Sequence, residues 1–170
     1  ASPMDFTPGV MDVMIKEREG RRVHTTVAKQ LAFYVTFFSP TQMLADLPEN
    51  YEGHPALPFL LQVPVDWEET QVLDGEIGEF LTMVRKDRHS EDWYLGSITN
   101  ESPRVLETDC GFLDEGRRYV AEIYADGAEG DWQTNPTALE LSQREVKKGT
   151  RLEIELAAGG GQAIRFRSVE

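Results

Sequence analysis

The stretch RLEIELAAGGGQAIRFR, residues 151–167, indicates most clearly which fold this sequence encodes. Polar and apolar residues alternate over 151–156 and again over 164–167, which is the pattern of strands with one buried and one solvated face. The glycine run Gly159–Gly161 lies between them and precedes no helix, so it does not predict a phosphate-binding loop. It predicts a hairpin turn or a close approach of two backbone segments.

The same pattern of short alternating runs extends from Glu68 to the end of the sequence. Three further runs have the length and composition of strands: Phe80–Val84, Trp93–Ile98 and Tyr119–Tyr124. Turn-forming residues, mostly Asp, Gly and Pro, separate these runs. Seven or eight short strands at this spacing are typical of an antiparallel β-sandwich, so we predict such a domain over residues 67–170.

Residues 1–66 follow a different pattern, which indicates helices between short strands. Apolar residues recur at spacings of three and four over Val23–Phe38 and predict a helix that ends at Ser39-Pro40. Three shorter elements are expected after it: a buried strand at Thr41–Ala45, a loop at Asp46–Tyr51 and a helix at Pro55–Leu61. This order is typical of a parallel barrel, so we assign residues 1–66 to the last βα elements of a (β/α)8 barrel.

The helix predicted at Val23–Phe38 is apolar over much of its circumference. A helix of this kind must pack on more than one side. Nothing else in residues 1–66 is large enough to cover it. We therefore expect that the segments covering this helix lie outside the sequence.

The net charge is −13 and is unevenly distributed. Residues 1–66 hold 5 Lys and Arg against 8 Asp and Glu, whereas residues 67–170 hold 12 against 22. So acidic a chain repels nucleic-acid phosphates and anionic lipid, and its longest apolar run, Leu31–Phe38, is too short to span a bilayer. We expect no nucleic-acid partner and no membrane span. A neutral sugar fits this charge balance, although solubility alone accounts for most of these charges.

Residues that commonly build metal sites are scarce. Cys110 is the one cysteine, which excludes an internal disulfide and a cysteine-rich metal site, and we expect a buried structural thiol. The histidines His24, His54 and His89 lack the i, i+3 or i, i+4 spacing of metal ligands. The sequence therefore predicts no metal-binding residue.

Several strings, in a shared order and spacing, are similar to motifs of glycoside hydrolase family 97. The strings PMDFTPG (3–9), VHTTVAKQLAFYV (23–35) and SPTQMLADLPENY (39–51) resemble the end of its catalytic barrel. The strings WYLGSIT (93–99), AEIYADG (121–127), TNPTA (134–138) and AGGGQAI (158–164) resemble its C-terminal domain. Each string alone is weak, but together they cover nearly the whole chain.

The resemblance implies an exo-acting α-glycosidase that hydrolyses α-linked glucosides or galactosides with a calcium ion in its active site. Family members join an N-terminal β-sandwich, a catalytic barrel and a C-terminal β-sandwich. The family's catalytic and calcium-binding glutamates belong to motifs upstream of residues 3–9, and none of them can be placed here. Since glycoside hydrolysis needs two flanking carboxyl groups, we expect no catalytic residue in this chain and an inactive isolated chain.

The resemblance also implies partners and a location. The partners are an oligosaccharide or α-glycoside substrate and the missing N-terminal and barrel segments. The location is the periplasm or the outside of a bacterium.

Four residues are candidates for substrate binding because they follow predicted barrel strands, where active sites of such barrels form. They are Asp5, Asp46, Glu49 and Asn50. The alternative is structural: Asp5 would cap a turn, and the other three would form a cap and turn cluster around Pro48. Asp46 and Glu49 come from one loop, so they are not expected to act as an acid/base pair.

Two other functions remain open for residues 67–170. The first is a carbohydrate-binding module, in which Trp132 of a long loop would stack on sugar rings. Clustering of Trp132 with Tyr51 or Tyr124 on one exposed face would favour it. The second is a purely structural domain without a ligand.

Overall fold

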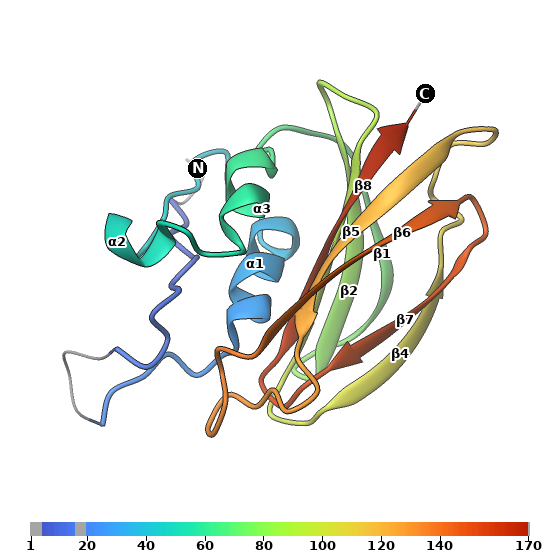
Figure 1. Cartoon of the computed structure of the whole chain (residues 1–170). Helices are drawn as coiled ribbons and strands as arrows, with labels where there is room; N and C mark the ends of the chain where they lie inside the picture. The colour runs from blue at the N-terminus through green and yellow to red at the C-terminus, as the bar shows by residue number, and fades with distance from the viewer. Residues whose placement is uncertain (1–4, 16–19, 170) are drawn as a thin grey trace.

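The computed structural model describes residues 5–15 and 20–169. Within these residues the helices are α1 (Val27–Thr36), α2 (Pro48–Tyr51) and α3 (Leu57–Gln62). The strands are β1 (Trp67–Glu76), β2 (Phe80–Asp87), β3 (Trp93–Thr99), β4 (Arg104–Asp109), β5 (Arg118–Asp126), β6 (Leu139–Lys147), β7 (Arg151–Leu156) and β8 (Gly161–Val169). The three helices precede all eight strands, and they gather on one side of the molecule (Figure 1).

The strands form an antiparallel sandwich of two unequal sheets, as the sequence predicts. The larger sheet has the order β1-β2-β3-β8-β5-β6, and the smaller one pairs β4 with β7. A core between the two sheets contains Trp93, Leu95, Ile154 and Phe166, together with the thiol of Cys110. The buried Cys110 confirms the expectation of a structural cysteine, and burial raises its pKa to about 12.

The glycine run after β7 is not a hairpin turn. β7 pairs with β4, whereas β8 pairs with β3 and β5, so residues 157–160 carry the chain from one sheet to the other. The close-approach alternative is the one observed, because a Cβ on Gly161 would lie 2.6 Å from the Cα of Lys29 in α1. The alternation of polar and apolar residues therefore located both strands, but it did not indicate which strands they pair with.

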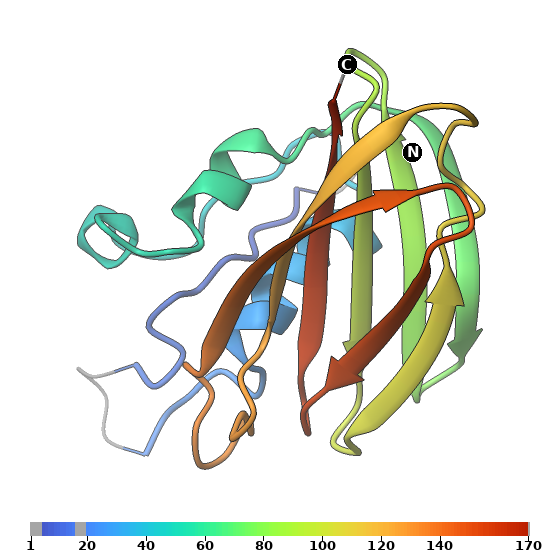
Figure 2. The ribbon, with the colours of Figure 1, turned by 45° about the vertical axis from the view of Figure 1, so that its right-hand side comes forward.

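α1 lies on the face of the large sheet opposite β4 and β7 (Figure 2). Its buried side chains, including Leu31 and Val35, join a second core with Tyr94 and Ala163 of the sheet. Gly96 permits this approach, because a Cβ there would lie 2.9 Å from the carbonyl oxygen of Ala32. The expectation that nothing in this sequence covers the helix was therefore wrong: the sandwich covers it.

The helix is shorter at both ends than predicted. Thr26 is its N-cap and accepts a hydrogen bond from the backbone N–H of Lys29 at 3.2 Å. The backbone N–H of Val23 is instead bonded to Val13 at 2.8 Å, and Phe37 is extended. Tertiary hydrogen bonds thus compete successfully with helix extension at residues whose spacing alone suits a helix.

Two extended segments lie parallel to each other next to α1. Phe6 bridges Gln42 in parallel, the N–H of Met43 donates to Phe6 O at 3.0 Å, and that of Ala45 donates to Pro8 O at 3.0 Å. The segment Thr41–Ala45 is largely exposed rather than buried as predicted, with Met43 and Leu44 both reaching solvent. Among the described residues this segment pairs as a strand with residues 6–8 only, and the side chains of Met43 and Leu44 stay exposed.

The chain then continues through two short helices. The predicted loop at Asp46–Tyr51 contains the single helical turn α2, which begins at Pro48, a residue whose fixed φ suits the first helical turn. The helix predicted at Pro55–Leu61 is α3, one or two residues further along the chain. The described residues form no closed barrel, and none of their helices is long and apolar enough to cross a membrane.

Candidate functional site

The polar site that the sequence indicated lies where the two parallel segments end. The loop Gly9–Asp12 follows the first segment, and Asp46 follows the second. Parallel pairing brings these two ends to the same edge. Asp46, Glu49 and Asn50 therefore lie at this edge, near the Gly9–Asp12 loop. Asp5 does not follow its segment as predicted, because it precedes Phe6 and so lies at the opposite end.

Asp46 is the centre of this site. Its Oδ2 accepts hydrogen bonds from the backbone N–H groups of Met11 at 2.8 Å and Asp12 at 2.7 Å. Its Oδ1 accepts from Leu47 N–H at 2.8 Å and from Asn50 Nδ2 at 2.7 Å. Burial raises the pKa of Asp46, but the hydrogen bonds from these four donors outweigh it and hold the pKa below its usual value.

Two further side chains, Tyr51 and Gln30, bond to the Gly9–Asp12 loop, and a third, Tyr34, bonds to Pro8 just before it. Tyr51 Oη donates to Gly9 O at 2.8 Å and accepts from the N–H of Asp46 at 2.9 Å. The buried Gln30 of α1 uses Oε1 to accept from Gly9 N–H at 2.9 Å. Tyr34 Oη lies 3.0 Å from Pro8 O, and burial raises the pKa of its hydroxyl. Neither Gln30 nor Tyr34 was singled out from the sequence, because their helical spacing reads as part of an apolar face.

The four predicted site residues divide into two pairs. Asp46 and Asn50 contact each other, and Asp46 holds the Gly9–Asp12 loop. This role is structural but differs from the predicted cap around Pro48, because the N-cap of α2 is Leu47 and no side chain within the described residues caps it. Asp5 and Glu49 are exposed at the surface. The sequence stretch that suggested Asp5 begins with residues that lie outside the described ones.

The arrangement can position a loop but does not itself form a catalytic or metal centre. Both carboxylate oxygens of Asp46 accept hydrogen bonds from protein donors, two each. Residues 5–15 and 20–169 contain no group of three or more His, Cys, Asp or Glu side chains that could hold a metal ion. The residues present therefore do not fit a calcium site.

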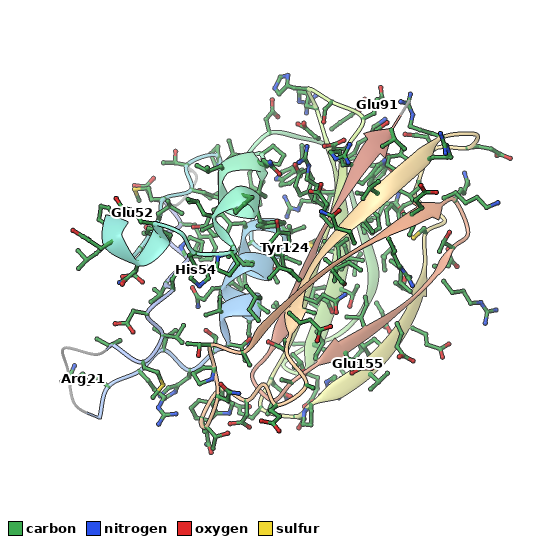
Figure 3. All side chains as sticks on the ribbon, in the orientation of Figure 1. Arg21, Glu52, His54, Glu91, Tyr124 and Glu155 are labelled. Atoms are coloured by element: carbon green, nitrogen blue, oxygen red, sulfur yellow. The ribbon has the colours of Figure 1, made fainter. Side chains whose placement is uncertain are left out.

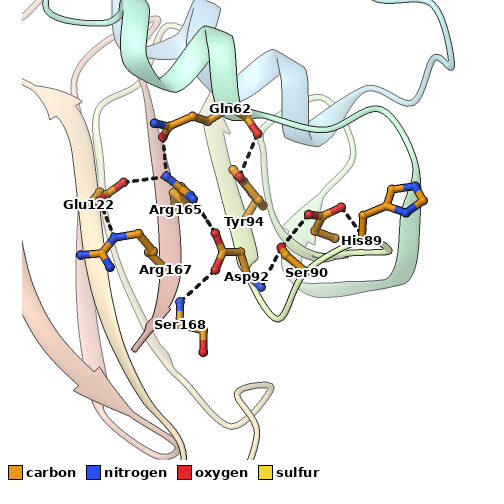
Figure 4. Close-up of polar contacts among 10 residues, drawn as sticks. Gln62, His89, Ser90, Asp92, Tyr94, Glu122, Arg165, Arg167 and Ser168 are labelled. Atoms are coloured by element: carbon orange, nitrogen blue, oxygen red, sulfur yellow. Dashed lines mark hydrogen bonds and ion pairs between the residues drawn. The ribbon is translucent and has the colours of Figure 1, made fainter. Parts of the chain in front are cut away.

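A second polar cluster, which the sequence did not reveal, joins α3 to the sheet (Figure 4). Arg165 of β8 donates from Nε at 2.9 Å and Nη2 at 2.7 Å to Asp92 Oδ2. It also contacts Gln62 at the end of α3, whose carbonyl oxygen accepts from Tyr94 Oη at 2.9 Å. An arginine in an alternating strand reads as a solvated residue, and only the tertiary fold places α3 over it.

Trp132, Tyr51 and Tyr124 do not form the exposed platform that a carbohydrate-binding module would need. Trp132 is half-buried and packs against the His24 ring, with centroids 4.8 Å apart. Tyr51 is buried, and Tyr124 points from β5 toward the helices, where its ring lies 5.3 Å from Phe59 of α3 (Figure 3). No specific contact thus favours the carbohydrate-binding module over the other functions.

Comparison with known protein sequences finds a family model and relatives that are glycosidases. The family model described as glycosyl-hydrolase 97 C-terminal, oligomerisation, matches residues 66–167. A protein named retaining alpha-galactosidase from Bacteroides thetaiotaomicron is 35% identical over 98% of this chain and 25% of its own length. One named probable retaining alpha-galactosidase from Streptomyces bingchenggensis is 30% identical over 94% of this chain and 23% of its own.

The fold is also similar to solved structures. A glycoside hydrolase family 97 enzyme from Pseudoalteromonas sp. strain K8 in complex with panose has a TM-score of 0.93 and 42% identity, covering 100% of this chain and 27% of that one. The chain thus spans about a quarter of the length of these relatives. Since the family model matches more than half of the residues, this chain belongs to glycoside hydrolase family 97, of which it contains the C-terminal domain.

Proposed function

We propose that this chain is the C-terminal part of an exo-acting α-glycosidase. In this proposal residues 1–66 are the last βα elements of the catalytic (β/α)8 barrel, and residues 67–170 are the sandwich that supports it. The observation that carries the proposal is the parallel pairing of Phe6 with Gln42 on either side of α1 in the sequence. Strand, helix and parallel strand form the repeating unit of such a barrel.

The packing of α1 supports this assignment. A barrel helix has strands on its inner side, and Tyr34 of α1 contacts Pro8 and Met43 of the parallel pair. The outer side of a barrel helix is free to meet another domain, and here it meets β3 and β8. The exposed Met43 and Leu44 are residues that neighbouring barrel strands would cover.

The substrate class is proposed from the relatives. Two are named as retaining alpha-galactosidases, and the Pseudoalteromonas enzyme was solved in complex with panose. We therefore propose an α-linked galactoside or glucoside as the substrate. Glu49, exposed near the edge that carries the Gly9–Asp12 loop, is proposed to contact it, while Asp46 and Asn50 hold the loop in place. Asp5 lies at the other end of its segment, so this proposal assigns it no contact with the substrate.

Our proposals for the calcium ion and for the location of the enzyme rest on the resemblance to the family. We propose that the longer enzyme binds calcium through residues outside this sequence, since the described residues offer no such ligand set. A bound calcium ion would orient or polarise the substrate. The proposed location is the periplasm or the extracellular space.

The test is hydrolysis of nitrophenyl α-galactoside and α-glucoside by the longer polypeptide and by residues 1–170 alone. We expect the longer polypeptide to hydrolyse one of them, to lose activity in EDTA and to regain it with calcium. We expect the 170-residue chain to be inactive, because two carboxyl groups flanking the scissile bond are required. A longer polypeptide inactive on both substrates, in calcium and in EDTA alike, would refute the proposal.

A further inference from the structure

Arg85 is a buried arginine that has no anionic partner among the residues that the structure describes. It lies on β2, on the face of the large sheet that carries α1, and it is 5% exposed. Its Nε has no hydrogen-bond partner within the described part of the chain, and its Nη2 lies 4.0 Å from the Sδ of Met83, a weak acceptor. Among residues 5–15 and 20–169, no carboxylate lies within ion-pair distance of this guanidinium.

Two aromatic rings compensate part of the cost of burying this charge. The guanidinium carbon is 5.6 Å from the centre of the Trp67 ring and 5.7 Å from that of Phe38. A cation–π contact contributes about 0.5–2 kcal/mol, whereas removing a charge from water costs several kcal/mol. Burial accordingly lowers the pKa of Arg85. The two rings therefore do not replace the hydrogen-bond acceptors that the N–H groups of the guanidinium lack.

A second arginine on the same face of the sheet shows what a complete site looks like. Arg165 is also largely buried, and it contacts Asp92, Glu122 and Gln62. Its charge is fully compensated within the chain. Because Arg165 is paired with carboxylates and Arg85 is not, we infer that the acceptor for Arg85 lies outside the described residues.

The surface over Arg85 is apolar and uncovered. Phe38 is 63% exposed and Phe37 is 48% exposed. The Phe37 ring packs at 5.2 Å from that of Phe6 in the parallel pair. This surface, which we call the Phe38 surface (Phe37, Phe38 and Arg85), is thus continuous with the uncovered parallel pair.

We propose that a segment of the catalytic part of the same polypeptide covers the Phe38 surface and supplies a carboxylate to Arg85. This inference rests on the proposed function. The occupant is chosen because the surface adjoins the parallel pair, whose missing neighbours belong to the barrel, and because about three quarters of the relatives lies outside this chain. A planar guanidinium binds a carboxylate through two hydrogen bonds. Such a pair would give the N–H groups of Arg85 the acceptors that the aromatic rings do not provide.

The first test uses thiol labelling, for which this chain is well suited. Cys110 is fully buried, so a cysteine introduced at the surface is the reactive thiol. We expect Phe38→Cys to react with a maleimide at least tenfold more slowly in the longer polypeptide than in residues 1–170. Val105→Cys, at a 65% exposed position on β4, is the control and should react equally in both.

The second test concerns the role of the charge. Arg85→Met keeps the packing between the two rings but removes the guanidinium. In the longer polypeptide it should lower the melting temperature and speed labelling in the Phe38→Cys background at least threefold. In residues 1–170 it should leave the melting temperature unchanged or raised, because an unpaired buried charge is removed.

Three results would overturn the inference. Equal labelling of Phe38→Cys in both polypeptides would show that nothing covers the surface. An equal loss of stability for Arg85→Met in both, or failure of that variant to fold in residues 1–170, would show that Arg85 serves internal packing. Protection in residues 1–170 that grows with protein concentration would identify a second copy as the occupant. Hydrolysis is measured separately, so an inactive but protected polypeptide would refute the proposed function rather than the docking.

Discussion

Asp46 illustrates how one carboxylate can order a whole loop. Two of its four hydrogen bonds tie the end of one extended segment to the loop that follows the other, and the other two come from its neighbours Leu47 and Asn50. The sequence placed Asp46, Glu49 and Asn50 at this edge, but it also placed Asp5 there, which lies at the opposite end of its segment. It could not show whether the side chains face a substrate or the backbone, because that depends on where a distant loop lies.

Substitution of Asp46 by Asn should destabilise the chain by about 1–3 kcal/mol, since backbone N–H groups lose their charged acceptor. Because the pKa of Asp46 is lowered in the folded state, its contribution is present above the unfolded value of about 4 and is lost as the pH falls through the folded pKa. Urea unfolding between pH 3 and 7 measures both effects. The exposed Glu49→Gln is the matched control, and equal effects of the two variants would argue against this role.

Arg165 makes a comparable prediction for the contact between α3 and the sheet. Arg165→Met leaves the buried Asp92 without its counter-ion and should cost about 3–5 kcal/mol. Arg167→Met, on the same strand but more exposed, should cost about 1 kcal/mol or less. Chemical denaturation of both variants tests this, and similar losses would show that the Arg165 cluster is not the stronger contact.

At the scale of elements, the periodic patterns located most strands and helices but not their ends or their pairing. The run at 151–156 is β7 as predicted, yet its partner is β4, which no alternation marked clearly. The helix at Val23–Phe38 begins at Val27 because Thr26 caps it and residues before it bond elsewhere. Strand pairing and helix ends depend on contacts between residues far apart in sequence, so local patterns cannot determine them.

The approach of α1 to β3 gives a prediction at this scale. Gly96→Ala places a Cβ within 3.0 Å of the helix backbone and side chains, so the helix must shift outward. We expect a loss of about 1–3 kcal/mol in the free energy of unfolding. Ser142→Ala, exposed on β6 of the same sheet, should change it by less than about 0.5 kcal/mol. A neutral Gly96→Ala would show that the helix is not held this closely.

For the whole molecule, the two apolar layers around α1 are the main finding. The helix contacts the parallel pair on one side and the large sheet on the other, so the sandwich replaces solvent as its outer neighbour. The sequence indicated that this helix needs cover but not that the strands after residue 66 provide it. That relation depends on contacts of α1 with β3 and β8, which are far from it in the sequence.

The most direct test of this account removes residues 67–170 from the longer polypeptide. Without the sandwich, α1 would expose Leu31, Val35 and their neighbours to water, at a cost of about 25 cal/mol per Å² of apolar surface. We predict that the truncated enzyme loses both its cooperative unfolding transition in urea and its hydrolysis of nitrophenyl α-glycosides. A truncated enzyme that unfolds cooperatively at the same urea concentration and keeps full activity would contradict the claim that the sandwich supports the barrel.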